Sequence, residues 1–144
     1  MDVNVEFILQ FNEIMKECDS VYRKFAKKFG ISECGLWIVY TIRLSEPIVQ
    51  SEICSRIYQS KQTINSSLKK LHEDGYIKMT ADIDKRKKLL SLTDKGTELA
   101  KRTADAVIAA EGGSLASFSD KERSEFFRLY KKFVCNMKKN MEEI

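Results

Sequence analysis

The chain of 144 residues has few of the residues and motifs on which enzymes and secreted proteins depend. It has one histidine, His72, and no glycine-rich phosphate loop, GxSxG motif or HExxH motif, so we expect no catalytic activity. Its four cysteines form no CxxC pair, which favours reduced thiols over a disulfide framework or a zinc site. We therefore expect neither a metal nor a cofactor.

Long apolar runs are absent as well. No stretch approaches the roughly 18 residues that a membrane span needs, and the N-terminus lacks the basic segment that begins a secretory signal. These absences predict a cytoplasmic protein without a membrane partner. The composition, with 43% hydrophobic and 32% charged residues and a single proline, favours one folded and largely helical chain.

Basic residues are concentrated in the middle third of the chain. The formal net charge is +4, but residues 56–102 contain twelve Lys+Arg against six Asp+Glu. That stretch carries +6, and the remainder carries −2. Such a distribution is the electrostatic footprint expected of a nucleic-acid-binding surface, and a solvated basic face is the alternative explanation.

Both ends of the chain have the spacing of amphipathic helices. The first helix ends at Gly30, and a shorter apolar helix begins at the N-cap Ser32 and stops before Pro47; the last begins at the N-cap Ser119. Because their apolar faces are broad for one subunit to cover, we expect a homodimer built from the termini, with an intramolecular helical bundle as the alternative. The apolar positions are Phe7, Phe11, Ile14, Cys18, Val21 and Phe25 at one end and Phe126, Tyr130, Phe133, Met137, Met141 and Ile144 at the other.

The central region has the pattern of a helix-turn-helix followed by a β-hairpin. One short helix is predicted over residues 51–58, and a second begins at the N-cap Ser60 and ends at Gly75. Two strand patterns follow, at residues 76–80 and 88–92. A charged segment between the strands would form the tip of the hairpin.

A further helix begins at Thr93 or Asp94 and is expected to break at Gly112-Gly113. The predicted fold is therefore mainly α (α+β). A winged helix-turn-helix lobe over residues 31–96 would lie between dimerisation helices over residues 1–30 and 97–144.

The helix that begins at Ser60 has an outward face suited to reading DNA. If Ile64, Leu68 and Leu71 are buried, the opposite side presents amides and hydroxyls for base edges and lysines for phosphates. No acidic residue precedes Glu73, whereas an ordinary solvated helix face, the alternative, usually mixes glutamate with lysine. The expected DNA-binding residues of this helix are Ser60, Lys61, Gln62, Thr63, Asn65, Ser66, Lys69 and Lys70.

The hairpin tip is the second candidate DNA-binding element. It contains Asp84, Lys85, Arg86 and Lys87, so that several cations lie at an exposed turn. An arginine at such a tip can enter a minor groove, where the phosphates on both sides raise the negative potential, and Asp84 could hold the guanidinium or the loop in register.

Three segments together resemble the MarR family of winged-helix regulators. They are SKQTINSSLKKLHEDGYI (residues 60–77), the wing Asp84-Lys85-Arg86 and the segment LTDKG (residues 92–96). The resemblance implies a triangular dimer joined by its terminal helices, with recognition helices in successive major grooves and wings in minor grooves. It also implies a sequence-specific regulator of double-stranded DNA with a pseudo-palindromic operator, and repression relieved by a small ligand or an oxidant.

The resemblance also implies a binding site for an effector. In the resembled family, ligands lodge between the dimerisation helices and the DNA-binding lobe, and Phe11, Met15, Trp37 and Tyr40 are the candidate pocket for a small aromatic or phenolic effector. Aromatic residues at helical spacing also make an ordinary core, which is the alternative.

The sequence leaves two further functions open. Some members of the resembled family sense peroxides through an N-terminal cysteine, so Cys18 is the candidate redox site. We expect it instead to lie buried in the apolar seam as a thiol of raised pKa. The last alternative is a winged helix that binds protein, which would not require an acid-free basic face.

Overall fold

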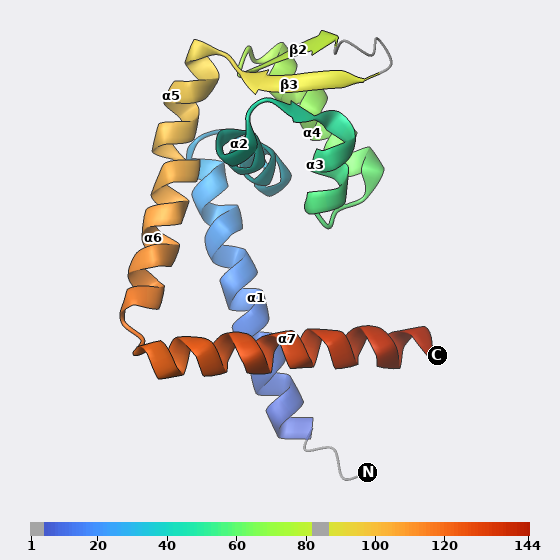
Figure 1. Cartoon of the computed structure of the whole chain (residues 1–144), viewed down its shortest axis with the longest axis vertical. Coiled ribbons are helices and arrows are strands. Elements are labelled where there is room, and N and C mark those ends of the chain that lie inside the picture. The colour runs from blue at the N-terminus through green and yellow to red at the C-terminus, as the bar shows by residue number, and fades with distance from the viewer. Residues whose placement is uncertain (1–4, 82–86) are drawn as a thin grey trace. The chain divides into compact units, whose positions relative to one another are not determined.

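The computed structural model describes residues 5–81 and 87–144 (Figure 1). These residues form a mainly helical chain with one small sheet, as predicted. The elements are α1 (Val5–Lys28), α2 (Glu33–Ser45), β1 (Ile48–Val49), α3 (Gln50–Arg56), α4 (Lys61–Glu73), β2 (Ile77–Ala81), β3 (Lys88–Leu92), α5 (Asp94–Arg102), α6 (Ala104–Ala116) and α7 (Asp120–Glu142). The chain divides into two compact units, residues 1–106 and residues 107–144.

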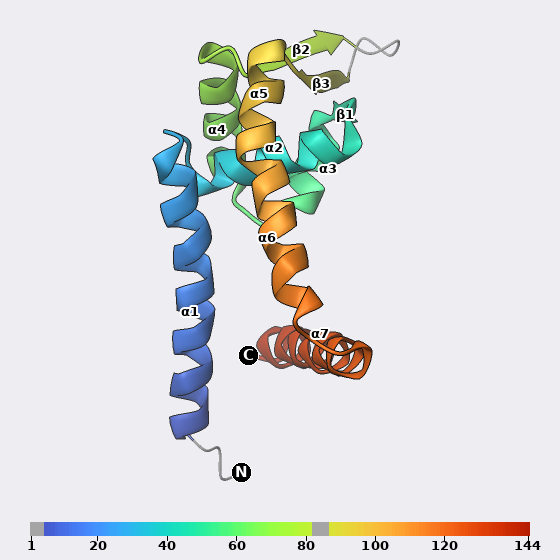
Figure 2. The same cartoon turned by 90° about the vertical axis from the view of Figure 1, so that its left-hand side faces the viewer.

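Helix α2 is the centre of the first unit. It lies among α1, α3, α4 and α5 in Figure 2, and it contacts each of them and β3. The side chains of Leu36, Ile38, Val39 and Ile42 on it are fully buried. A helix that is apolar over most of its surface is stable only when other elements cover it, because each buried large aliphatic side chain contributes about 1.5–3 kcal/mol. The helix-turn-helix and the hairpin are therefore held on one shared core.

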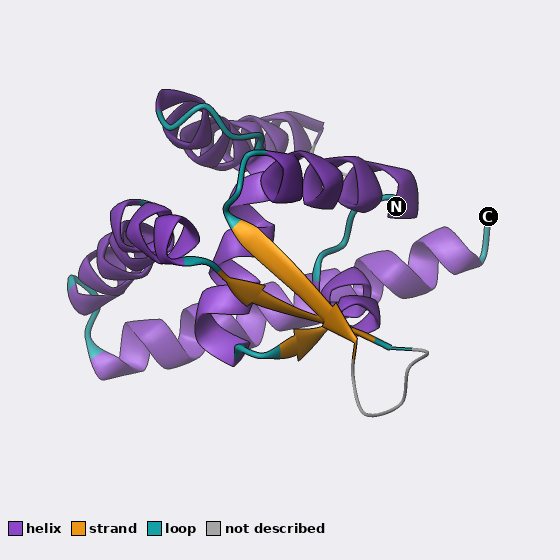
Figure 3. Cartoon of the chain, turned by 90° about the horizontal axis from the view of Figure 1, so that it is seen from above, coloured by secondary structure: helices purple, strands orange, loops and turns teal. Residues whose placement is uncertain are grey.

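The sheet is antiparallel with strand order β1-β3-β2. The hairpin pairs Ile77 with Leu92 at its base and Ala81 with Lys88 at its far end, which confirms the predicted β-hairpin (Figure 3). β1 is a third strand that the sequence pattern did not predict, and it pairs Ile48 with Leu90 on the other side of β3. A strand of two residues has no periodicity from which it could be recognised.

Local capping explains where the helices begin. The predicted N-caps Ser32, Ser60 and Ser119 each accept a hydrogen bond from a backbone N–H in the first turn of the helix that follows, at 2.9, 3.1 and 3.3 Å. Each bond satisfies an amide that would otherwise lack a partner. These three predicted helix starts are therefore confirmed. For α5, whose start was left between Thr93 and Asp94, Thr93 is the N-cap and accepts from the N–H of Gly96 at 3.0 Å.

Two predictions about the helices are wrong. The helix after the hairpin breaks at Thr103, between α5 and α6, and the predicted break site, Gly112-Gly113, lies within α6. Thr103 is fully buried, and its hydroxyl donates to the carbonyl oxygen of Leu99 at 2.7 Å. A threonine hydroxyl that bonds back into its own helix favours such a bend, whereas an exposed glycine costs a helix only about 1 kcal/mol.

The second wrong prediction is the burial of Cys18. This residue was expected to be buried, but its side chain is exposed in the single chain. The reason is that α1 buries one residue, Ala26, and leaves Phe7, Ile14 and Val21 exposed along the same helix. Within the first unit, the apolar seam around Cys18 is therefore exposed.

Helix α7 dominates the second unit. It is described over its whole length and has no buried residue, although it carries large apolar side chains. Phe118 and Tyr130 lie against the ring of Phe126, with ring centroids 5.9 Å apart in both contacts. The exposed apolar residues of α7 are Phe126, Phe127, Leu129, Tyr130, Phe133, Met137 and Met141.

Candidate nucleic-acid interface

Helix α4 separates a buried face from a polar one. Ile64, Leu68 and Leu71 are at most 3% exposed, as the spacing predicted. Every residue that we expected to contact DNA on this helix is exposed, from the N-cap Ser60 to Lys70. The structure therefore brings these side chains onto one solvent-facing surface of the first unit.

The charge on α4 is uneven along its length. Lys69 and Lys70 lie near the carboxylates of Glu73 and Asp74, at 3.8 and 3.2 Å, in the C-terminal turns. The N-terminal turn has no acidic residue, and Lys61 is exposed there. The end of the helix with the amides and hydroxyls is therefore the end whose positive charge is not offset by an acidic side chain on the same turn.

The turn before α4 begins at the C-cap of α3. The N–H of Ile57 donates to the carbonyl oxygen of Ile53 at 2.9 Å, and both side chains are buried. Between the helices, Tyr58 is 91% exposed beside the start of α4. Because the sequence pattern counted Tyr58 as the last residue of a helix, it was missed as a candidate contact.

A long-range polar contact was also missed. The side-chain amide of Gln50, the first residue of α3, donates to Oδ1 of Asn65 at 3.5 Å. Both residues line a surface cleft whose other polar lining residues include three lysines. The cleft is lined by Val49, Gln50, Ser51, Cys54, Lys61, Asn65, Lys87 and Lys88.

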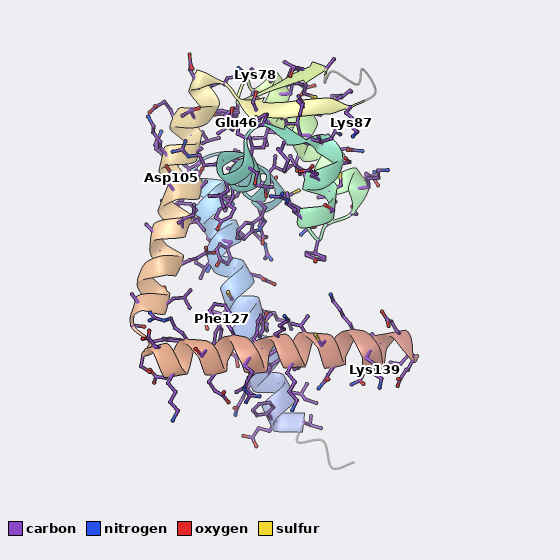
Figure 4. All side chains as sticks on the ribbon, viewed as in Figure 1. Glu46, Lys78, Lys87, Asp105, Phe127 and Lys139 are labelled. Carbon is purple, nitrogen blue, oxygen red and sulfur yellow. The ribbon has the colours of Figure 1, made fainter. Side chains whose placement is uncertain are left out.

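The cleft lies where the helix-turn-helix meets the wing. Lys87 and Lys88 are exposed at the start of β3, and Lys78 is exposed on β2 (Figure 4). The predicted wing residues Asp84, Lys85 and Arg86 lie outside the described residues. Lys87 and Lys88, at the far end of the hairpin, therefore add positive charge beside Lys61 in the N-terminal turn of α4.

The LTDKG segment fixes the wing against the end of α4. The hydroxyl of Thr93 donates to the carbonyl oxygen of Gly75 at 2.6 Å, and Lys95 Nζ donates to that of Asp74 at 2.7 Å. A Cβ on Gly96 would lie 1.8 Å from the carbonyl oxygen of Tyr76, so only glycine lets α5 approach this closely. These contacts tie the start of α5 to the turn between α4 and β2.

Cys34 and Ser67 join α2 to α4 beneath the exposed face. Burial raises the pKa of the Cys34 thiol, and a hydrogen bond with Ser67 opposes that rise. Ser67 Oγ also lies 3.3 Å from Ser32 Oγ, the N-cap of α2. Cys34 is thus part of the packing that supports α4.

The candidate effector residues lie partly in an aromatic cluster. The Trp37 ring lies between Tyr22 and Tyr40, with centroid distances of 4.8 and 5.6 Å. Phe11 and Met15 are half-buried on α1 in the turns before Tyr22. The contacts of Trp37 are those of packed aromatic residues at the junction of α1 and α2.

Other kinds of site find no support within residues 5–81 and 87–144. No cluster of three or more His, Cys, Asp or Glu side chains able to hold a metal ion occurs among them. None of their helices is both long enough and apolar enough to cross a membrane.

Comparisons with known proteins agree with this arrangement. Residues 35–96 match the winged helix DNA-binding domain family. The chain is 26% identical to the uncharacterized HTH-type transcriptional regulator YwoH of Bacillus subtilis, over 92% of this chain and 96% of that protein.

Solved structures share the fold over nearly the whole chain. A MarR family regulator from Neisseria meningitidis has a TM-score of 0.76 at 24% identity, covering 93% of this chain and 95% of that one. MepR of S. aureus, solved in a complex with DNA, has a TM-score of 0.75 at 17% identity, covering 91% and 97%.

The central part of this chain is therefore a winged-helix domain. The described chain as a whole has the fold of MarR family regulators of known structure, the fold that the sequence resemblance implied. The relatives are named as regulators and not as enzymes.

Proposed function

We propose that the protein is a homodimer that binds a pseudo-palindromic double-stranded DNA operator and represses transcription. The observation that carries the DNA proposal is the exposed N-terminal half of α4, which presents Gln62, Asn65 and Ser66 beside Lys61 with no carboxylate on that turn. Amides and hydroxyls can bond base edges in a major groove, and lysines can neutralise phosphates. Lys87 and Lys88, at the far end of the hairpin, extend the same positive surface.

The dimer proposal rests on the terminal helices. On α7 and the first turns of α1, large apolar side chains are exposed in the single chain, Phe7 to the extent of 68%. Contiguous apolar surface of this kind marks a site of association. A two-fold dimer of recognition helices would in turn require two half-sites about one helical turn of DNA apart.

The proposal also includes a small aromatic effector that relieves repression. The aromatic cluster around Trp37 lies where α1 meets α2, so a planar ligand that separated these helices would disturb the support of α4. Thermal-shift screening of phenolic compounds, with Trp37→Leu as the matched variant, tests it. A set of compounds that leaves the melting temperature of the wild type unchanged would remove the effector from the proposal.

The DNA proposal is tested by selecting bound duplexes from a random pool with the purified protein. We expect a two-fold symmetric consensus with half-sites about 10 base pairs apart. Lys61→Ala should weaken binding to that consensus, whereas the control Lys101→Ala, which removes an exposed lysine of α5 paired with Glu98, should not. A protein-binding winged helix would yield no enriched sequence.

A further inference from the structure

Ion pairs join α2 to two other helices, one pair at each of its ends. At its start, Glu33 lies 3.4 Å from Arg23 of α1, and at its end Arg43 pairs with Asp105 of α6. Local ion pairs, such as those of Lys69 with Glu73 and of Arg128 with Glu125, instead join residues three or four positions apart. Since α2 also packs on α4, it connects the recognition helix with the helices that lead to both termini.

The pair formed by Arg43 and Asp105 has two-point geometry. Arg43 Nε donates to Oδ1 of Asp105 at 3.0 Å, and Arg43 Nη2 donates to Oδ2 at 2.9 Å. The hydrogen bond from Arg43 lowers the pKa of the Asp105 carboxyl, so the pair stays ionised at neutral pH. A parallel two-point contact fixes the orientation of both groups, which a single contact such as that of Arg23 does not.

The two-point contact between Arg43 and Asp105, the fork, lies directly after the break between α5 and α6. The N–H of Thr103 is shared between the carbonyl oxygens of Leu99 and Ala100, at 2.9 and 3.2 Å, and the first turn of α6 begins at the next residue. Helix direction is least constrained where the regular hydrogen-bond ladder stops. Asp105 lies in that first turn, so its contact with Arg43 fastens the start of α6 to α2.

We propose that Arg43 and Asp105 are positioning residues that set the half-site spacing which the protein accepts. This inference rests on the proposed function, because it concerns a dimer bound to two half-sites. If the fork fixes the direction in which α6 leaves α2, it fixes the direction of the arm through which each recognition helix is joined to the dimer. Loss of the fork would let that direction vary, and duplexes with other spacings would then be accepted.

The test measures affinity for duplexes that carry the selected half-sites at the preferred spacing and at spacings one and two base pairs longer or shorter. We expect wild type to favour one spacing by at least about fivefold, and Arg43→Lys to reduce the preference below about twofold, a range typical of coupling between sites. Arg43→Lys keeps the charge and loses the fork. Asp105→Asn should act likewise, and the reciprocal pair Arg43→Asp with Asp105→Arg should restore the preference.

Arg128→Lys is the matched control. Arg128 makes a two-point contact with Glu125 inside α7, at 2.8 and 2.6 Å, so its replacement removes a fork that joins no two helices. It should leave the spacing preference unchanged. Affinity for a duplex with a single half-site should be the same in all variants.

Three results would overturn the inference. The first is a full spacing preference in Arg43→Lys and Asp105→Asn, with or without a lower melting temperature, since the pair would then be only structural. The second is an equal loss of preference in the Arg128→Lys control. The third is a wild type that binds the selected duplexes without a spacing preference, in which case the inference fails while DNA binding stands. A wild type that binds no duplex would instead contradict the proposed function itself.

Discussion

The winged-helix unit and the C-terminal unit differ in how far their apolar side chains are buried. In the first, α2 buries Leu36, Ile38 and Ile42 completely beneath α4 and the sheet. In the second, α7 exposes phenylalanine, leucine and methionine side chains and buries none. One unit therefore has a core of its own, whereas the main helix of the other leaves its apolar side chains exposed, and the dimer proposal assigns a second copy to cover them.

Truncation gives the largest expected effect. Removal of Lys121–Ile144 deletes most of α7, so the exposed apolar residues of α1 would lose the partner surface that the dimer proposal assigns to them. We expect aggregated or unfolded protein by light scattering and circular dichroism. A soluble, well-folded monomer after this truncation would contradict the dimer.

Single leucine substitutions compare a buried side chain of the first unit with an exposed side chain of the second. Leu36→Ala empties a fully buried site and should lower the free energy of unfolding by about 2–5 kcal/mol. Leu129→Ala, on a residue 49% exposed in α7, should act mainly by raising the dimer dissociation constant.

Urea unfolding and sedimentation at several protein concentrations separate these two effects. The change in free energy for Leu36→Ala should not depend on concentration. If Leu129→Ala leaves dimer dissociation unaffected, α7 is not the surface that joins the subunits.

Two glycines give the smallest of these effects, with opposite signs. Gly96→Ala would place Cβ against the carbonyl oxygen of Tyr76 and should cost about 1–3 kcal/mol through backbone displacement. Gly112→Ala, in α6, meets nothing within 4 Å and should stabilise the protein by about 0.5–1 kcal/mol through helix propensity. Denaturant unfolding of both variants checks the signs, and a neutral Gly96→Ala would show that the close approach of α5 is not required.

Local chemistry made much of the fold predictable. Ser60 and Ser119 cap their helices because a serine hydroxyl satisfies a free amide within three residues, and this depends on sequence alone. The buried side of α4 followed from helical spacing in the same way. These features need no knowledge of what packs against them.

The features that were missed depend on distant contacts. The helix breaks at Thr103, which is buried in the folded chain and whose hydroxyl bonds back to Leu99, whereas the exposed Gly112-Gly113 pair continues as helix. Likewise, the Gln50–Asn65 contact and the fork between Arg43 and Asp105 join residues far apart in sequence. Periodicity contains no information about such pairs.

The most direct test of DNA reading by α4 is a salt titration of operator affinity for wild type, Gln62→Ala and Lys61→Ala on selected and unrelated duplexes. Gln62→Ala should cost about 1–3 kcal/mol on the selected duplex and little on unrelated DNA, because an amide reads a base edge. Lys61→Ala should weaken binding to both duplexes and reduce the salt slope by about 1, because a lysine contacts phosphate. Equal losses for Gln62→Ala on both duplexes, or a wild type without sequence preference, would contradict the account.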